Sequence, residues 1–153
     1  MAAATALFLT SCGSEPKPTS APAPVQNAET PKPPDESRRF PTANLVDTKV
    51  VNNHLLDKQF MPGGTLAHYK KGKLEYDMFV AKLATPTDSA ILLPDWRKAL
   101  TDVQPVPSFG GLFGMDAGRP VFVFPKGPWI LGIAGLSQKE ADAQGRILAG
   151  RVN

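Results

Sequence analysis

Two histidines and a few carboxylates are the residues of this sequence whose types could support metal or acid–base chemistry. His54 and His68 are the only histidines, and they form no His-x-x-x-His or His-Glu-x-x-His pattern. A metal site would have to combine one histidine with carboxylates such as Glu75 or Asp77. If a hairpin turn centres on Lys71-Gly72, His68 lies opposite Glu75, and we favour a solvent-facing cross-strand pair over a metal site. No metal ligand and no cofactor is therefore assigned.

A glycine-rich stretch, Phe109 to Gly118, is the most unusual segment of the sequence. Its glycines and aromatics define a candidate binding loop, made of Phe109, Gly110, Gly111, Phe113 and Asp116. It lacks the Gly-x-Gly-x-x-Gly and Gly-Lys-Ser/Thr orders of phosphate loops. We favour a wide hairpin or bulged edge whose aromatics fill the core, with the rim of a binding cleft as the alternative. The chain also lacks a Gly-x-Ser-x-Gly elbow, so no catalytic residue is assigned.

Cys12 is the only cysteine, which excludes an intramolecular disulfide. It follows an apolar run at 2–10 that is too short to span a bilayer as a helix and is typical of a secretory signal. The order Leu9-Thr10-Ser11-Cys12 resembles the lipobox of bacterial lipoproteins. That resemblance implies a signal peptide at 1–11, cleavage before Cys12, and lipid attachment, including palmitate, at Cys12. Gly13 after the cysteine slightly favours the outer membrane.

The start of the sequence departs from this pattern in one respect, because no Lys or Arg precedes the apolar run. Two interpretations follow: a start codon placed too late, or an apolar N-terminus with a free thiol. Residues 14–37 hold seven prolines and one large apolar residue, Val25. Such a composition cannot bury enough surface to fold. We therefore expect a proline-rich tether at 12–39 and a single domain at 40–153.

The net charge of +3 belongs to the expected domain, because the tether is neutral. An excess spread over a whole domain is not the clustered basic face of a nucleic-acid-binding protein, so no nucleic acid is expected. The expected partners are the membrane, through the lipid on Cys12, and either another envelope protein or a small ligand.

Alternating apolar residues and turn signals place the elements of the domain. A helix should begin at Thr85, an N-cap followed by Pro86 and Asp88, and break at Pro94. Residues 102–118 read as a loop with a short strand near 108–115. The last helix is marked by the capping box from Ser137 to Glu140. The remaining elements are a first hairpin at 65–70 and 73–83, an edge strand within the irregular lead-in at 43–60, and a second hairpin at 121–124 and 129–135.

This order predicts an α+β fold, a small two-layer sandwich whose antiparallel sheet carries its helices on one face. The arrangement, hairpin-helix then hairpin-helix, is similar to sandwiches of the Mog1/PsbP type, which also occur among bacterial lipoproteins. The favoured function is a lipid-anchored bacterial envelope protein with a non-catalytic domain that binds a protein or ligand. The alternatives are an envelope hydrolase with a site near Asp116 and His68, and a structural spacer.

Overall fold

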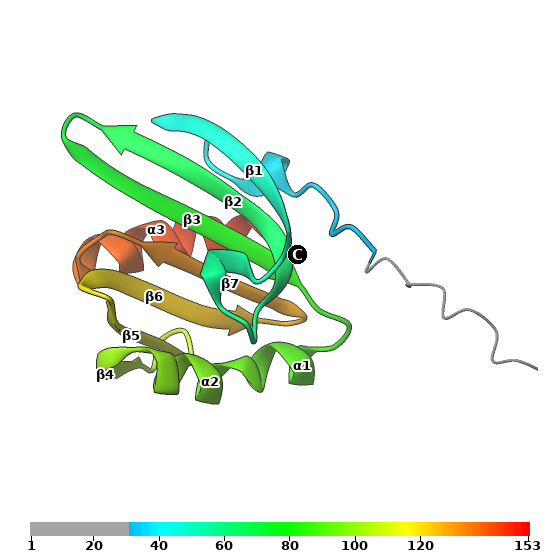
Figure 1. Ribbon diagram of the computed structural model, residues 1–153. Helices are drawn as coiled ribbons and strands as arrows, with labels where there is room; N and C mark the ends of the chain where they lie inside the picture. The colour runs from blue at the N-terminus through cyan, green and yellow to red at the C-terminus, as the bar shows by residue number, and fades with distance from the viewer. Residues whose placement is uncertain (1–30) are drawn as a thin grey trace, which may run out of the picture.

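Seven antiparallel strands form a single sheet in the computed structural model, which describes residues 31–153 of the chain (Figure 1). The strand order is β1-β2-β3-β7-β6-β5-β4, so two meanders meet where β3 pairs with β7. The strands are β1 (Leu45–Asn53), β2 (Pro62–Lys71), β3 (Leu74–Lys82), β4 (Thr101–Val106), β5 (Gly111–Asp116), β6 (Arg119–Lys126) and β7 (Trp129–Ala134). The helices are η1 (Ser37–Arg39), η2 (Leu55–Asp57), α1 (Pro86–Ala90), α2 (Leu92–Ala99) and α3 (Gln138–Arg151).

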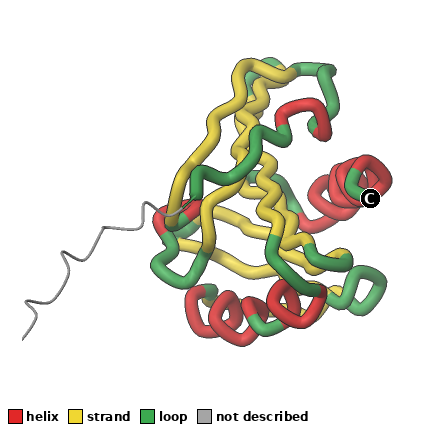
Figure 2. Tube along the Cα trace, turned by 90° about the vertical axis from the view of Figure 1, so that its right-hand side faces the viewer, coloured by secondary structure: helices red, strands yellow, loops and turns green. Residues whose placement is uncertain are grey.

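The sheet buries both of its faces. In β6, Phe122 and Phe124 pack in one apolar cluster with Leu148 of α3, whereas Val121 and Val123 pack in a second cluster with Trp96 of α2. Because successive side chains of a strand point to opposite faces, α3 covers one face and α2 the other. We call these the α3 face and the α2 face. Figure 2 shows helices on two sides of the sheet.

The expected antiparallel sheet with helices is confirmed, but the two-layer sandwich is not. Trp129, Leu131 and Ile133 of β7 face α3, while Ile130 and Ala134 face α2. A strand that is apolar on both faces has to be covered on both. Placing the helices on one face would have left half of these side chains in water.

The first hairpin forms at the expected place with a different register. β2 and β3 are joined by Gly72 and Lys73, and Gly72 has a φ of +62°. This loop lies one residue further along than a turn centred on Lys71-Gly72. His68 therefore pairs with Asp77, and the predicted pairing of His68 with Glu75 is wrong. The partner of Glu75 is Lys70, which forms an exposed ion pair with it at 2.7 Å.

The helix predicted from Thr85 is confirmed, with its break in a slightly different place. The Asp88 amide donates to the Thr85 hydroxyl at 3.1 Å, and the Thr85 amide donates to the Asp88 carboxylate at 3.0 Å. This capping box begins α1 at Pro86. The helix breaks between Ala90 and Leu92, before Pro94. Pro94 does not break α2, because it falls in the first turn of that helix, where no backbone amide hydrogen is needed.

The segment at 102–118 is more ordered than the loop that the sequence predicts. β5 (Gly111–Asp116) matches the strand expected near 108–115, but β4 (Thr101–Val106) was not expected. β4 contains Pro105, an irregular register between Thr101 and Gln104, and Asp102 at a φ of +50°. These features are tolerated because β4 is an edge strand, with one side free of the ladder.

The chain is already packed before Phe40. Glu36 is only 8% exposed, and its amide donates to the Thr65 hydroxyl at 3.0 Å. Arg39 lies 4.5 Å above the Trp129 ring and donates to the Arg151 carbonyl at 3.1 Å, while Arg151 donates to the Phe40 carbonyl at 3.3 Å. The two ends of the domain thus bind each other. The expected signal peptide at 1–11, Cys12 and the tether as far as residue 30 lie outside the described residues.

Candidate functional site

A groove on the α3 face is the feature of the described chain best suited to hold a ligand. It has a volume of about 440 Å³ and lies between the first turns of α3 and the strands β4 and β6. This volume falls in the range of small-molecule sites. The groove is lined by two apolar residues of the sheet and three polar residues of α3: Val106, Phe122, Gln138, Lys139 and Asp142.

The first turn of α3 is fixed by its cap, which positions the polar side of the groove. Both the amide and the hydroxyl of Ser137 donate to the Glu140 carboxylate, at 3.3 and 2.6 Å. The helix therefore begins at Gln138, as the sequence predicts, and places Gln138, Lys139 and Asp142 beside the groove. The buried Gly145 lets the helix approach the sheet, since a Cβ there would lie 2.8 Å from the Phe122 ring.

An aromatic cluster continues the apolar side of the groove. Phe109 packs edge-on against Phe122, with ring centroids 5.1 Å apart, and lies 4.7 Å from Phe124. The Arg146 guanidinium lies 5.1 Å from the Phe109 centroid and binds the Asp142 carboxylate at 2.9 Å. An apolar group bound here would contact aromatic rings on one side and the charged side chains of Arg146 and Asp142 on the other.

The five residues of the candidate binding loop are not gathered into one site. Phe109 and Phe113 pack on the α3 face, beside Phe122. Gly110 takes a φ of +61° in the turn, and a Cβ on Gly111 would lie 2.4 Å from the Val123 carbonyl. Asp116 lies on the α2 face, where it binds Lys58 at 2.7 Å. The aromatics fill the core, and Phe109 also flanks the groove.

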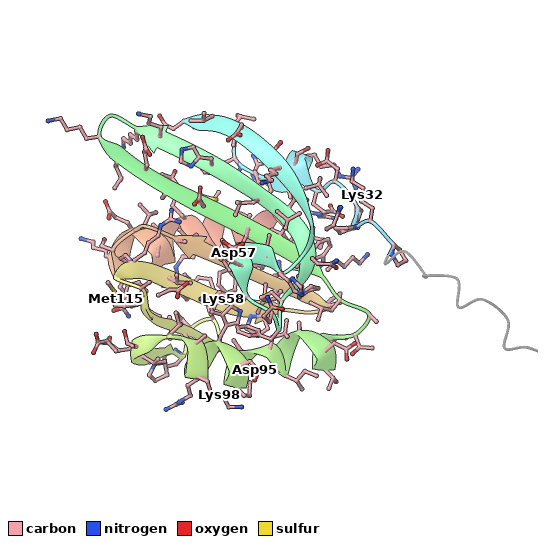
Figure 3. All side chains as sticks on the ribbon, viewed as in Figure 1. Lys32, Asp57, Lys58, Asp95, Lys98 and Met115 are labelled. Atoms are coloured by element: carbon pink, nitrogen blue, oxygen red, sulfur yellow. The ribbon has the colours of Figure 1, made fainter. Side chains whose placement is uncertain are left out.

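A second polar cluster lies on the α2 face and joins residues of β2, β3 and β6. Asp77 binds His68 Nδ1 at 2.7 Å through one carboxylate oxygen and Arg119 at 2.8 Å through the other. The Asp77 side chain is 14% exposed and Arg119 also donates to the Ala134 carbonyl. Figure 3 shows Lys58 in front of the sheet on this same side.

Both carboxylates of the α2-face cluster have partners. Asp77 is bound to His68 and Arg119, and Asp116 is bound to Lys58. His54 lies apart from His68, in the loop before η2. Within residues 31–153 no group of three His, Cys, Asp or Glu side chains could hold a metal ion. Asp116 and His68 therefore bind different partners, Lys58 and Asp77.

Sequence reasoning missed the groove, because it forms where α3 meets strands that are distant in the sequence. It also missed the Asp77–Arg119 pair. The alternation of apolar and polar residues along β3 places Asp77 on the α2 face. Only the pairing of β3 with β7, and of β7 with β6, brings Arg119 close to it. No pattern within either segment predicts that contact.

Comparisons with known proteins identify the fold and nothing finer. No family model matches the chain and no curated protein does. A protein of Thermotoga maritima described as a GTP binding regulator has a similar structure, with a TM-score of 0.53 and 12% sequence identity. The match covers 75% of this chain and 82% of that one. At this identity the likeness shows a shared fold. Among the described residues, no helix is long and apolar enough to cross a membrane.

Proposed function

We propose that this chain is a lipid-anchored protein of the bacterial envelope, whose folded domain binds a protein or a small ligand without catalysing a reaction. The single observation that carries the anchor is Cys12, the only cysteine, in the order Leu9-Thr10-Ser11-Cys12 after a short apolar run. Seven prolines between residues 14 and 37 supply a spacer between that cysteine and the packed chain. The outer membrane is the favoured membrane.

The binding role is supported by the groove on the α3 face. Its apolar floor and polar rim have the composition of ligand sites, which are mostly apolar with a few polar groups that fix orientation. The competing hydrolase site would need Asp116 and His68 together, whereas Asp116 binds Lys58 and His68 binds Asp77. GTP regulation is not carried over from the Thermotoga protein, because a likeness at 12% identity concerns the fold alone.

The anchor is tested by the mass of the N-terminal peptide from membranes of the native host. We expect the wild-type protein to begin at a Cys12 that carries lipid, and Cys12→Ala to leave the membrane fraction. Ser14→Ala, two residues away, is the matched control and should be processed normally. A wild-type protein that retains Met1, unmodified and soluble, would exclude the anchor.

The groove is tested with an anilinonaphthalene sulfonate, an aromatic anion that becomes fluorescent in apolar surroundings. We expect its rings to contact Phe122 and its sulfonate to face Lys139. Lys139→Glu should weaken binding several-fold. Lys98→Glu, which reverses an exposed charge on α2, should leave it unchanged. Equal binding by both variants would show that the probe binds elsewhere.

A further inference from the structure

The two edges of the sheet differ in how well they are protected against pairing with another strand. β4 contains Pro105, which has no amide hydrogen, together with an irregular register and a left-handed Asp102. Such features protect an edge. β1 (Leu45–Asn53) contains no proline and is regular from Asp47 to Asn53. Figure 1 shows it along the outer edge of the sheet, remote from β4. Among the described residues no strand lies on its outer side.

The exposed charges of β1 are self-complementary. If two β1 strands pair antiparallel around a two-fold axis at Thr48, Asp47 of each copy lies opposite Lys49 of the other. Both side chains are exposed, and neither forms an ion pair with another residue of the part that the structure describes. A lysine in an edge strand normally opposes pairing. In this register each lysine meets a carboxylate, so the same residue favours it.

The next pair in this register is apolar. Val46, the residue within the irregularity between Leu45 and Asp47, lies beside Val50 of the second copy and is 58% exposed, one of the few large apolar side chains that the domain leaves in water. Shifting the axis by one residue in either direction removes the charge match, because Asp47 then no longer lies opposite Lys49 of the other copy. The pattern of charge and apolar residues therefore selects one register.

We propose that β1 binds β1 of a second copy of this chain in a two-fold antiparallel pair centred on Thr48. The contact is isologous, so the same residues serve both copies, and it joins the two seven-stranded sheets into one. The irregularity between Leu45 and Asp47 keeps the paired stretch short. The dimer is therefore weak in solution. If the proposed lipid anchor confines two copies to one membrane, their effective concentration rises.

A cysteine at the axis tests the register directly. The full chain carrying Cys12→Ala has no other thiol, so Thr48→Cys in that background introduces a single one. Directly opposite residues of an antiparallel pair have Cα atoms about 4.5 to 5.5 Å apart, a distance that a disulfide spans. We expect Thr48→Cys to form a disulfide dimer under mild oxidation. Gln104→Cys, which is also exposed but lies on β4, should form far less. Equal yields from the two variants would overturn the proposal.

Charge reversal tests the complementarity without a new covalent bond. Asp47→Lys or Lys49→Asp places like charges opposite each other at two symmetry-related positions, which should weaken self-association about tenfold. The double variant Asp47→Lys/Lys49→Asp restores opposite charges and should recover it. Sedimentation over a concentration series measures the dimer fraction, and circular dichroism confirms that each variant folds. A double variant that associates no better than the single ones would refute the charge pairing.

Discussion

Replacing Gly132 by alanine should destabilise the domain more than a single methyl group ordinarily does. Gly132 lies in the middle of β7, opposite Phe79 on one side and Val123 on the other. A Cβ built there would lie 2.2 Å from Cζ of the buried Phe79 and 2.5 Å from the Phe122 carbonyl oxygen. The phenyl ring is enclosed and the carbonyl belongs to the neighbouring strand, so neither can move away freely.

The expected loss follows from this overpacking. Extra methyl groups in well-packed cores typically cost about 1 to 3 kcal/mol, and two contacts this short place Gly132→Ala near the upper end, at about 3 kcal/mol. Urea denaturation of the full chain, followed by the fluorescence of the buried Trp96 and Trp129, measures the free energy of unfolding. Gly150→Ala is the matched control. Its Cβ meets nothing within 4 Å, so this variant should be unchanged or more stable by up to about 1 kcal/mol.

A double-mutant cycle identifies the ring as the obstacle. Phe79→Leu shortens the side chain that the new Cβ would meet, so the combined loss in Phe79→Leu/Gly132→Ala should be smaller than the sum of the two single losses. Harmless surface changes alter the free energy of unfolding by up to about 0.5 kcal/mol. If the value for Gly132→Ala lies that close to wild type, the packing of β7 against Phe79 is not as described.

Three further predictions concern buried polar groups. Both tyrosines of the chain, Tyr69 and Tyr76, have a pKa raised by burial, so the rise of absorbance at 295 nm should come at a higher pH than for free tyrosine. Because the unfolded chain ionises first, the tyrosines' contribution to stability should be constant below about pH 10 and be lost as the pH rises further, and a titration of the folded protein at the pH of free tyrosine would contradict this. Thr65→Val removes the acceptor of the Glu36 amide in a fully buried position and should cost about 1 to 3 kcal/mol in urea denaturation, whereas Thr48→Val on the exposed edge should have little effect. Asp77→Asn weakens the bonds to His68 and Arg119 and should cost about 1 to 3 kcal/mol, while Glu75→Gln at the exposed Lys70 pair should hardly change stability; equal losses would show that the Asp77 cluster is no stronger than a surface pair.

Local signals predicted the elements that depend on neighbouring residues. The capping boxes at Thr85 and Ser137, the first hairpin and the apolar strands β6 and β7 can be recognised within a few residues of sequence. β4 could not, because Pro105 and the flanking prolines and glycines resemble a loop, and only its position at the sheet edge makes a strand there acceptable.

The arrangement of elements that are distant in the sequence was harder to predict from the sequence. The double-sided apolar pattern of Val121 to Phe124 already required cover on both faces, yet it does not say which helix supplies it. The hairpin register depended on which two residues of 70–73 form the loop, and a one-residue shift of the turn changed the partner of His68 from Glu75 to Asp77. The groove depends on a helix crossing strands that are distant in sequence, for which no local pattern exists.

The contact between residues 39–40 and Arg151 determines how the domain bears mechanical load. The chain enters the domain beside its C-terminus, and paired guanidinium–carbonyl bonds join the two. A pull on the N-terminal segment therefore acts first on Arg39, Glu36 and the C-terminal end of α3, before it reaches the sheet. Tension would release this short segment while the seven strands stay paired. In single-molecule pulling, Arg39→Ala should lower the force of that first small extension and leave the main unfolding force unchanged.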